Sequence, residues 1–226
     1  MKLLQGWTLF EKVWLTAFSS IQFILFFWWQ QTAIDLICAL ANMLCVVLVA
    51  KGRMENFFFG MVATSLYAYI SFNNHIYGEA MLSGLFYFPM QFIGLYFWIK
   101  NRNKQTDISS DIQVKKLTAK GWMLMLAVVL SCSFGYAEIL AHLNAQQVRL
   151  DSFTVVICIV AQILMTLRYS EQWYLWISSN ILGIIIWAVA GNYAMLMMTC
   201  ASLFNSLYGA YHWQKQVSLT QQTSSS

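Results

Sequence analysis

The chain has 226 residues, of which 59% are hydrophobic and only 10% are charged, and its formal net charge is +4. This composition excludes an ordinary soluble domain and is typical of a polytopic membrane protein. The five cysteines lie within apolar runs and show no metal-ligand spacing, so we interpret them as small buried hydrophobes.

Apolar runs predict membrane-spanning helices, because an α-helical span needs roughly 20 mostly apolar residues. Residues 1–32 are predicted to form an N-terminal helix that is either interfacial or an eighth span. Seven further spans are predicted to begin near Ile34, Asn56, Gly78, Gly121, Ser152, Gln172 and Asn192. The polar stretch 214–226 predicts a disordered tail, because it has too few apolar groups to pack.

The first half of the chain repeats in the second half at a nearly constant offset. An offset of 116 (151 − 35) places Asp35 on Asp151 and Glu55 on Glu171. An offset of 115 then places the group Gly94, Tyr96, Trp98 on Gly209, Tyr211, Trp213. Internal repeats are common in membrane transporters, which often bind substrate where the repeats meet near mid-membrane. The repeat therefore favours a transport function.

The repeat predicts an all-α polytopic membrane protein of 3+1+3 transmembrane helices. Two three-helix repeats, 33–100 and 151–213, are joined by a basic cytoplasmic loop, 101–118, and a linker transmembrane helix, 119–142. Lys51 and Arg168 follow the first span of their respective copies on the same basic side, which predicts parallel repeats. The linker supplies the odd number of spans that parallel copies require.

Basic loop residues predict the orientation, because Lys and Arg are retained in short cytoplasmic loops. One side receives only Arg149 from the loops, whereas the other receives Lys51, Arg53, Lys100, Arg102, Lys104, Lys115, Lys116, Lys120, Arg168 and Lys215. We therefore expect a multi-pass protein of the cell inner membrane (plasma membrane) with a cytoplasmic C-terminus.

Polar and aromatic residues gather near the middle of every repeat span, which predicts a substrate site. They are Asn42, Thr64, Tyr87, Gln91, Gln162, Asn180 and Asn205. Buried amides must be hydrogen-bonded, so these side chains should face inward, either toward a ligand or toward a neighbouring helix. Their common depth favours a ligand site.

Trp173, Trp176 and Asn180 follow one face of the sixth span at spacings of three and four. An indole one turn from an amide suits a flat, polar, cationic ring, although Trp173 also suits an interfacial anchor. No Lys or Arg lies near the middle of a span, so a phosphate would find no permanent positive partner there. Neutral or cationic polar solutes are therefore favoured over nucleotides.

Three motifs carry a resemblance to a known family, namely the run Glu171-x-Trp173-x-x-Trp176-Ile177-x-x-Asn180, the Gly78-Glu79 pair and the sequence Tyr87-x-Pro89. In these motifs and in its repeat, the chain resembles the PnuC-type nicotinamide riboside transporters. These transporters are related to the SWEET sugar transporters. The resemblance covers about Asp35 to Trp213 and implies import of nicotinamide riboside by facilitated diffusion with alternating access. It carries over Trp173, Trp176 and Asn180 as substrate-site residues. SWEET-type repeats use several prolines as hinges, whereas this chain has only Pro89, so we expect small rigid-body rocking.

We expect a small-molecule substrate and the lipid bilayer as partners, with no nucleic acid, no cofactor, no metal and no catalytic residue. A homo-oligomer is left open. Thiamine or riboflavin remain alternative substrates, because their transporters also need aromatic faces and amides. An intramembrane enzyme or a ligand-binding sensor is the alternative of another class, although the three histidines lie at span ends and do not cluster in the sequence.

Overall fold

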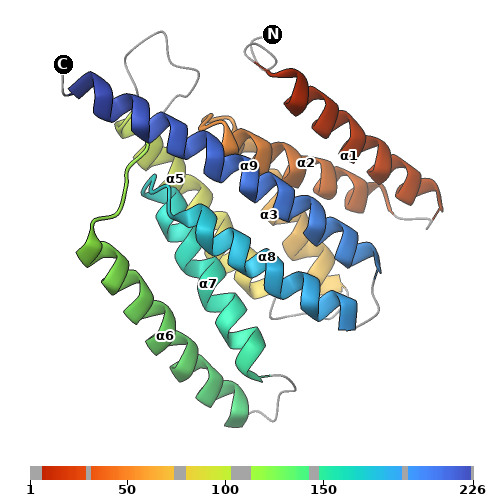
Figure 1. Ribbon diagram of the computed structural model, residues 1–226. Coiled ribbons are helices and arrows are strands. Elements are labelled where there is room, and N and C mark those ends of the chain that lie inside the picture. Colours follow the sequence, from red (N-terminus) through yellow and green to blue (C-terminus); the bar gives the residue numbers. More distant parts are fainter. Residues whose placement is uncertain are drawn as a thin grey trace. The chain divides into compact units, whose positions relative to one another are not determined.

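The computed structural model describes residues 7–28, 32–73, 80–102, 113–142, 148–189 and 193–224. Within these ranges there is no strand, and the all-α prediction is confirmed. The helices follow the chain in the order α1 (Leu9–Trp28), α2 (Ala33–Ala50), α3 (Asn56–Asn73), the π-helix η1 (Leu82–Tyr87), α5 (Phe88–Lys100), α6 (Ala119–His142), α7 (Val148–Thr166), α8 (Gln172–Val189) and α9 (Tyr193–Ser224) (Figure 1).

The chain divides into two compact units, Met1–Ile112 and Gln113–Ser226. In the first unit α1 packs on α2, α2 packs on α3, and α3 packs on both η1 and α5. In the second unit α6 packs on α7, α7 on α8, and α8 on α9. Consecutive helices are therefore neighbours within each unit, as short connections require.

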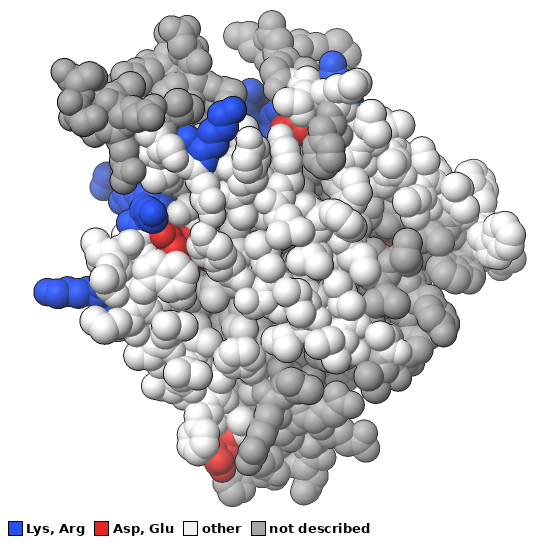
Figure 2. Space-filling view, in the orientation of Figure 1, with Lys and Arg blue, Asp and Glu red and all other residues white. Residues whose placement is uncertain are grey.

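The surface is strongly apolar. By length and composition, three of the described helical segments could cross a membrane, namely Ala33–Ala50, Leu82–Lys100 and Ala119–Glu138, and Ser152–Thr166 is a shorter apolar helix. Figure 2 shows that most of the visible described surface belongs to uncharged residues. An apolar surface of this extent is normally covered by lipid or protein.

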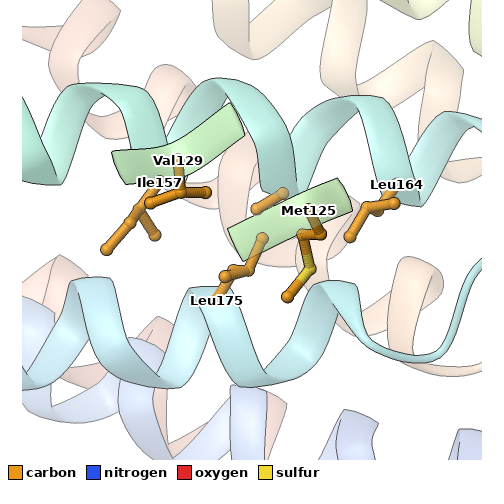
Figure 3. Packing of buried hydrophobic residues seen from close by; sticks show 6 residues of the cluster. Met125, Val129, Ile157, Leu164 and Leu175 are labelled. Atoms are coloured by element: carbon orange, nitrogen blue, oxygen red, sulfur yellow. The ribbon is translucent and has the colours of Figure 1, made fainter. Parts of the chain in front are cut away.

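The core of the second unit lies where α6, α7 and α8 meet. Met125 and Val129 of α6 pack with Ile157 and Leu164 of α7 and with Leu175 of α8 (Figure 3). The α6 residues are four positions apart and therefore lie on one side of the helix. Trp122 and Ser133 extend the same side of α6, whereas most of the other described side chains of this helix are exposed, so α6 is joined to its unit along one narrow stripe.

The turn between the first two repeat helices has the same backbone conformation in both units. Gly52 and Arg168, which are 116 positions apart (168 − 52), have positive φ angles of 66° and 67°. The Gly52 N–H donates to the carbonyl of Val49 at 2.9 Å, and the Arg168 N–H donates to that of Met165 at 3.0 Å. The offset found in the sequence thus corresponds to a shared local structure.

Helix α1 is attached to the C-terminal end of α2. Its first turn carries a capping box, in which the Thr8 N–H donates to Glu11 Oε2 at 2.7 Å and the Glu11 N–H donates to Thr8 Oγ1 at 3.2 Å. Lys51 Nζ lies 2.6 Å from the same Glu11 oxygen, and both side chains are buried. Because the start of α1 meets the end of α2, these helices of 20 and 18 residues run antiparallel.

Helix α2 begins with a second capping box. The Asp35 N–H donates to Thr32 Oγ1 at 3.3 Å, and the Thr32 N–H donates to Asp35 Oδ2 at 3.0 Å. Asp35 therefore serves as a helix cap, which also places its negative charge at the favourable end of the helix dipole.

Helix α9 continues to Ser224, through most of the stretch for which the sequence predicts a disordered tail. Gln214 Nε2 donates to the hydroxyl of Tyr174 on α8 at 2.6 Å, and Gln216 is buried. The expectation from composition differs from the structure here because Gln and Lys are good helix formers and can extend a helix that is already packed.

Candidate functional site

Trp173, in the first turn of α8, packs tightly against α9. Its indole is 3% exposed and lies against Gly209, with Cε2 2.7 Å from the position that a β-carbon would take there. The indole also meets the ring of Trp213 edge to face, with 5.9 Å between centroids and 83° between planes. Only glycine at position 209 leaves room for this contact, which joins α8 to α9.

Phe57 makes the corresponding contacts in the first unit. It lies against Gly94 and meets Trp98 edge to face, with 4.9 Å between centroids and 85° between planes. Phe57 matches Trp173 at the offset of 116 (173 − 57), and Gly94 matches Gly209 at 115 (209 − 94). This equivalence favours a helix-packing role for Trp173, and its place in the substrate site stays a prediction.

Trp176 and Asn180 lie on the following turns of α8. Trp176 is half-buried and packs against the core formed by α6, α7 and α8. Asn180 Nδ2 donates to Ser206 Oγ of α9 at 3.0 Å, and the Ser206 hydroxyl donates to the carbonyl of Ser202 at 2.9 Å. The structure therefore fixes the Asn180 amide one turn away from a partly exposed indole, and the binding of a polar ring by these two side chains stays a prediction.

Ser206 belongs to this group although the depth argument missed it. The repeat contains the signal that could have found it, because Gln91 at an offset of 115 falls on Ser206 (91 + 115 = 206). Gln91 contacts Gly60 in the first unit, and Ser206 contacts Asn180 in the second. Equivalent positions of the last helices thus make a polar contact with the middle helix in both units, although the partners differ by one turn, because Gly60 corresponds to Trp176 and Asn180 to Thr64.

In the first unit, Gln91 and Thr64 both contact Gly60, and Gln91 also bonds to the backbone of Tyr87. The side chain of Gln91 is 5% exposed and lies against Gly60, and its Nε2 donates to the carbonyl of Tyr87 at 3.3 Å. Thr64 Oγ1 donates to the carbonyl of Gly60 at 2.8 Å. Gln91 Oε1 is buried without a hydrogen-bond partner, so it retains an acceptor for a ligand or a water molecule.

Tyr87 closes the π-helix η1, where the backbone is irregular. The Phe88 N–H donates to the carbonyl of Ser83, five residues earlier, and Pro89 follows at the start of α5. Proline has no N–H to donate, which removes one helical hydrogen bond at this point. Single π turns occur frequently at functional sites, so the location of Tyr87 is compatible with a ligand-binding role.

The remaining candidates lie in different environments. Gln162 of α7 is 5% exposed, and its Nε2 has no hydrogen-bond partner, whereas Asn205 is buried on α9 beside Ser206. Asn42 is exposed on α2 and is not part of the group around Gly60. An unpaired buried amide costs about 1–3 kcal/mol, so Gln162 is the stronger candidate for an additional polar contact.

Positive charge is remote from these groups along the helices. Helices α2, α3 and α8 contain no Lys or Arg, and α5 has only Lys100 at its end. In α7 the only basic residue is Arg149, in the first turn, and in α9 it is Lys215, beyond Trp213. The candidate residues therefore offer aromatic faces, amides and hydroxyls, which bind polar rings and sugars better than phosphate groups.

Comparison with known proteins shows the family of the chain. Residues 32–215 match the family model described as nicotinamide mononucleotide transporter. Over 223 residues the chain is 42% identical to the nicotinamide riboside transporter PnuC of Neisseria mucosa, covering 96% of this chain and 85% of that protein. The chain belongs to the PnuC transporter family.

Two further comparisons agree with membership of the PnuC family. The nicotinamide riboside transporter PnuC of Haemophilus influenzae is 38% identical over 215 residues, covering 95% of this chain and 94% of that protein. The crystal structure of the vitamin B3 transporter PnuC matches the fold with a TM-score of 0.83 and 41% identity, covering 96% of this chain and 95% of that one. The protein is therefore a membrane transporter of a small molecule, and the enzyme alternative is excluded by its family.

Proposed function

We propose that this PnuC-family protein imports nicotinamide riboside by facilitated diffusion with alternating access. The observation that carries the proposal is the oriented Asn180 amide, one turn from Trp176, in a chain 42% identical to a nicotinamide riboside transporter. The indole would stack on the cationic nicotinamide ring, and the amides of Asn180 and Gln91 would bind the ring carboxamide or the ribose hydroxyls.

The substrate named by the family model and the substrate named for the relatives differ by one phosphate group. The family model is described by the mononucleotide, whereas the relatives are named for the riboside. We favour the riboside, because the described helices that hold the candidate residues have no Lys or Arg near those residues along the helix. A phosphate carries about −1.5 to −2 charges at neutral pH and needs paired positive groups when it leaves water.

The charge distribution supports a cytoplasmic C-terminus in the cell inner membrane. The start of α1 meets the end of α2. We therefore favour a cytoplasmic N-terminus, with α1 as an eighth span rather than an interfacial helix. Cysteines introduced at positions 2 and 225 should both resist a membrane-impermeant maleimide applied from outside intact cells. Labelling of position 2 alone would contradict the eighth span.

The experiment that tests the function is uptake by proteoliposomes containing the purified protein. Labelled nicotinamide riboside should equilibrate across the membrane, and an imposed proton or sodium gradient should leave the final level unchanged, because no carboxylate lies near the middle of a repeat span. Nicotinamide mononucleotide, thiamine and riboflavin serve as competitors. Stronger competition by thiamine or riboflavin than by the riboside itself would reassign the substrate, and binding without flux would indicate a sensor.

A further inference from the structure

Each unit begins with a helix that precedes its three-helix repeat. In the first unit this is α1, which packs on α2, and in the second it is α6, which packs on α7. The two helices have similar lengths, 20 and 24 residues, and each is followed after a short connection by the first repeat helix. They therefore hold corresponding positions in the chain order of the two units.

A buried glutamate attaches α1 to the turn between α2 and α3. Glu11 is 2% exposed, and its Oε2 lies 2.6 Å from Nζ of Lys51, the residue that precedes Gly52 in this turn. The ammonium group also lies 5.1 Å from the ring centroid of Trp7, which precedes α1. The start of α1 is thus fixed by an ion pair and a cation–π contact.

Another buried glutamate attaches the start of α6 to the equivalent turn of the second unit. Residues 113–118, which we call the strap, pair with that turn through the Lys115 N–H to the Arg168 carbonyl at 2.8 Å and the Ser170 N–H to the Lys115 carbonyl at 2.9 Å. Glu171, 1% exposed, accepts the Leu117 N–H at 3.0 Å. The strap leads directly into α6.

The strap also explains why the second unit has arginine where the first has glycine. A positive φ strains any residue except glycine, yet Arg168 adopts the conformation of Gly52. Its Nη1 donates to the carbonyl of Gln113 at 3.2 Å, and its own carbonyl accepts the Lys115 N–H. Hydrogen bonds to the strap therefore hold this residue in a conformation that would otherwise be unfavourable.

We propose that α1 and α6 are equivalent helices, each clamped to its own unit, and that Glu11 and Glu171 are positioning residues that keep the clamps closed throughout transport. The proposal rests on the proposed transport function. Each clamp is made inside one unit and consists of buried or backbone hydrogen bonds, so it has no part that must break when substrate binds. The transporter then moves as two bodies of four helices, with η1 and α5 counted as one continuous helix, and α6 moves with the second body.

A disulfide across the strap tests whether that clamp stays closed. Lys115 and Tyr169 are paired in an isolated parallel β-bridge. Backbones paired in this way lie about 4.8 Å apart, within the range of about 4.4–6.8 Å between the Cα atoms of a disulfide. The variant Lys115→Cys/Tyr169→Cys should cross-link on oxidation and transport nicotinamide riboside within about twofold of its reduced form. The single-cysteine variants are the controls. Failure to cross-link, or uptake that is lost on oxidation and restored by reductant, would overturn the closed clamp.

Substitution of Glu171 tests its positioning role. Glu171→Met keeps the length of the side chain but removes the acceptor, so trypsin should cut after Lys115 and Lys116 at least about tenfold faster, as an unpaired strap would allow. The maximal uptake rate should fall by about tenfold with KM within twofold, because Trp173 still holds α8 on α9. Glu171→Gln retains a carbonyl acceptor and should restore both measures.

Glu55 provides the matched control, because it holds the equivalent position in the first unit. It is partly exposed and pairs with Arg53 at 2.7 Å, and hydrogen bonding from Arg53 lowers the pKa of the Glu55 carboxyl. Glu55→Met should leave cleavage after Lys115 and KM unchanged. Equal effects of Glu55→Met and Glu171→Met would contradict the proposal. If Glu171→Met does not fold, Glu171→Gln and the disulfide variant still test whether the clamp stays closed. Cross-linking and cleavage need no substrate, so they separate failure of the clamp from failure of the proposed function.

Discussion

The side chain of Gln91 fills the space beside Gly60. Its Cδ atom lies 2.8 Å from the position that a β-carbon would take at residue 60, and Cys45 Sγ lies 3.3 Å from the same point. The second unit has Trp176 at the position equivalent to Gly60 and Ser206 at the position equivalent to Gln91. A small residue facing a long amide has thus been replaced by a large residue facing a short hydroxyl, and the two units present different groups from similar helices.

Gly60→Ala should displace Gln91 and weaken nicotinamide riboside binding by about tenfold, about 1.4 kcal/mol, if Gln91 contacts the substrate. Gln91→Ala should lose about as much affinity, and the double variant should lose no more than either single variant, because both changes remove the same contact. Calorimetry on the purified variants gives the three affinities. Gly135→Ala is the control, since nothing lies within 4 Å of a β-carbon at that position. Additive losses would assign separate roles to Gly60 and Gln91.

Trp176→Ala should lower the affinity for nicotinamide riboside by at least about tenfold, or 1.4 kcal/mol, because it removes the aromatic face next to Asn180. Trp173→Ala should act mainly on stability, because truncation of a packed Trp costs about 3–5 kcal/mol. Trp173→Phe supplies the residue that the first unit has at this place, and it should retain affinity. Thermal unfolding and calorimetry on the same preparations separate the two effects. A large affinity loss in Trp173→Phe would restore Trp173 to the substrate site.

Ser206→Ala removes the acceptor that orients Asn180 and should raise the Kd for nicotinamide riboside by about three- to tenfold, the worth of one hydrogen bond. Asn180→Ala in the Ser206→Ala background should add less than it does alone, because both substitutions act on the same amide. Ser178→Ala is a suitable control, since the Ser178 hydroxyl is exposed and donates only within α8, to the carbonyl of Tyr174 at 2.9 Å. Unchanged affinity in Ser206→Ala would show that Asn180 needs no support from α9.

Glu11→Gln should destabilise the protein by about 3–5 kcal/mol, because Lys51 would remain buried without its opposite charge. Replacing both residues, as in Glu11→Gln/Lys51→Met, should recover much of the loss, since no unpaired charge remains. Thermal unfolding in detergent measures both variants, and Lys12→Met, on the exposed neighbouring position, is the control. An equal loss in the single and double variants would show that packing rather than charge stabilises α1.

The apolar runs and the repeat predicted much of the fold. Helices α3 and α8 begin at the predicted residues, Asn56 and Gln172, because the turn before each of them follows one hydrogen-bonding pattern. The offset of 115 between the last helices predicted equivalent positions there as well, since Gly94 and Gly209 contact the aromatic rings of Phe57 and Trp173. Constant spacing predicts equivalent contacts even where few residues are identical.

Other features depend on contacts that sequence spacing does not reveal. The position of α1 depends on the pairing of Glu11 with Lys51, which is 40 residues away. The sequence position of Trp173 is compatible with an interfacial anchor, a ligand contact or a packing residue, and only its contact with Gly209 in the structure favours packing. Depth along a helix likewise selected Asn42, which is exposed, and missed Ser206, because depth does not report the direction of a side chain.

With α1 as an eighth span, as we propose, each unit contains four spans, and this allows a simpler origin for the chain. A unit with an even number of spans begins and ends on one side of the membrane, so its gene can duplicate in tandem and both copies insert with the same orientation. No adaptor helix has to be acquired between the copies. Such a fusion would join the copies at the boundary between the two units, after Ile112, and the chain could be separated there into two co-expressed halves.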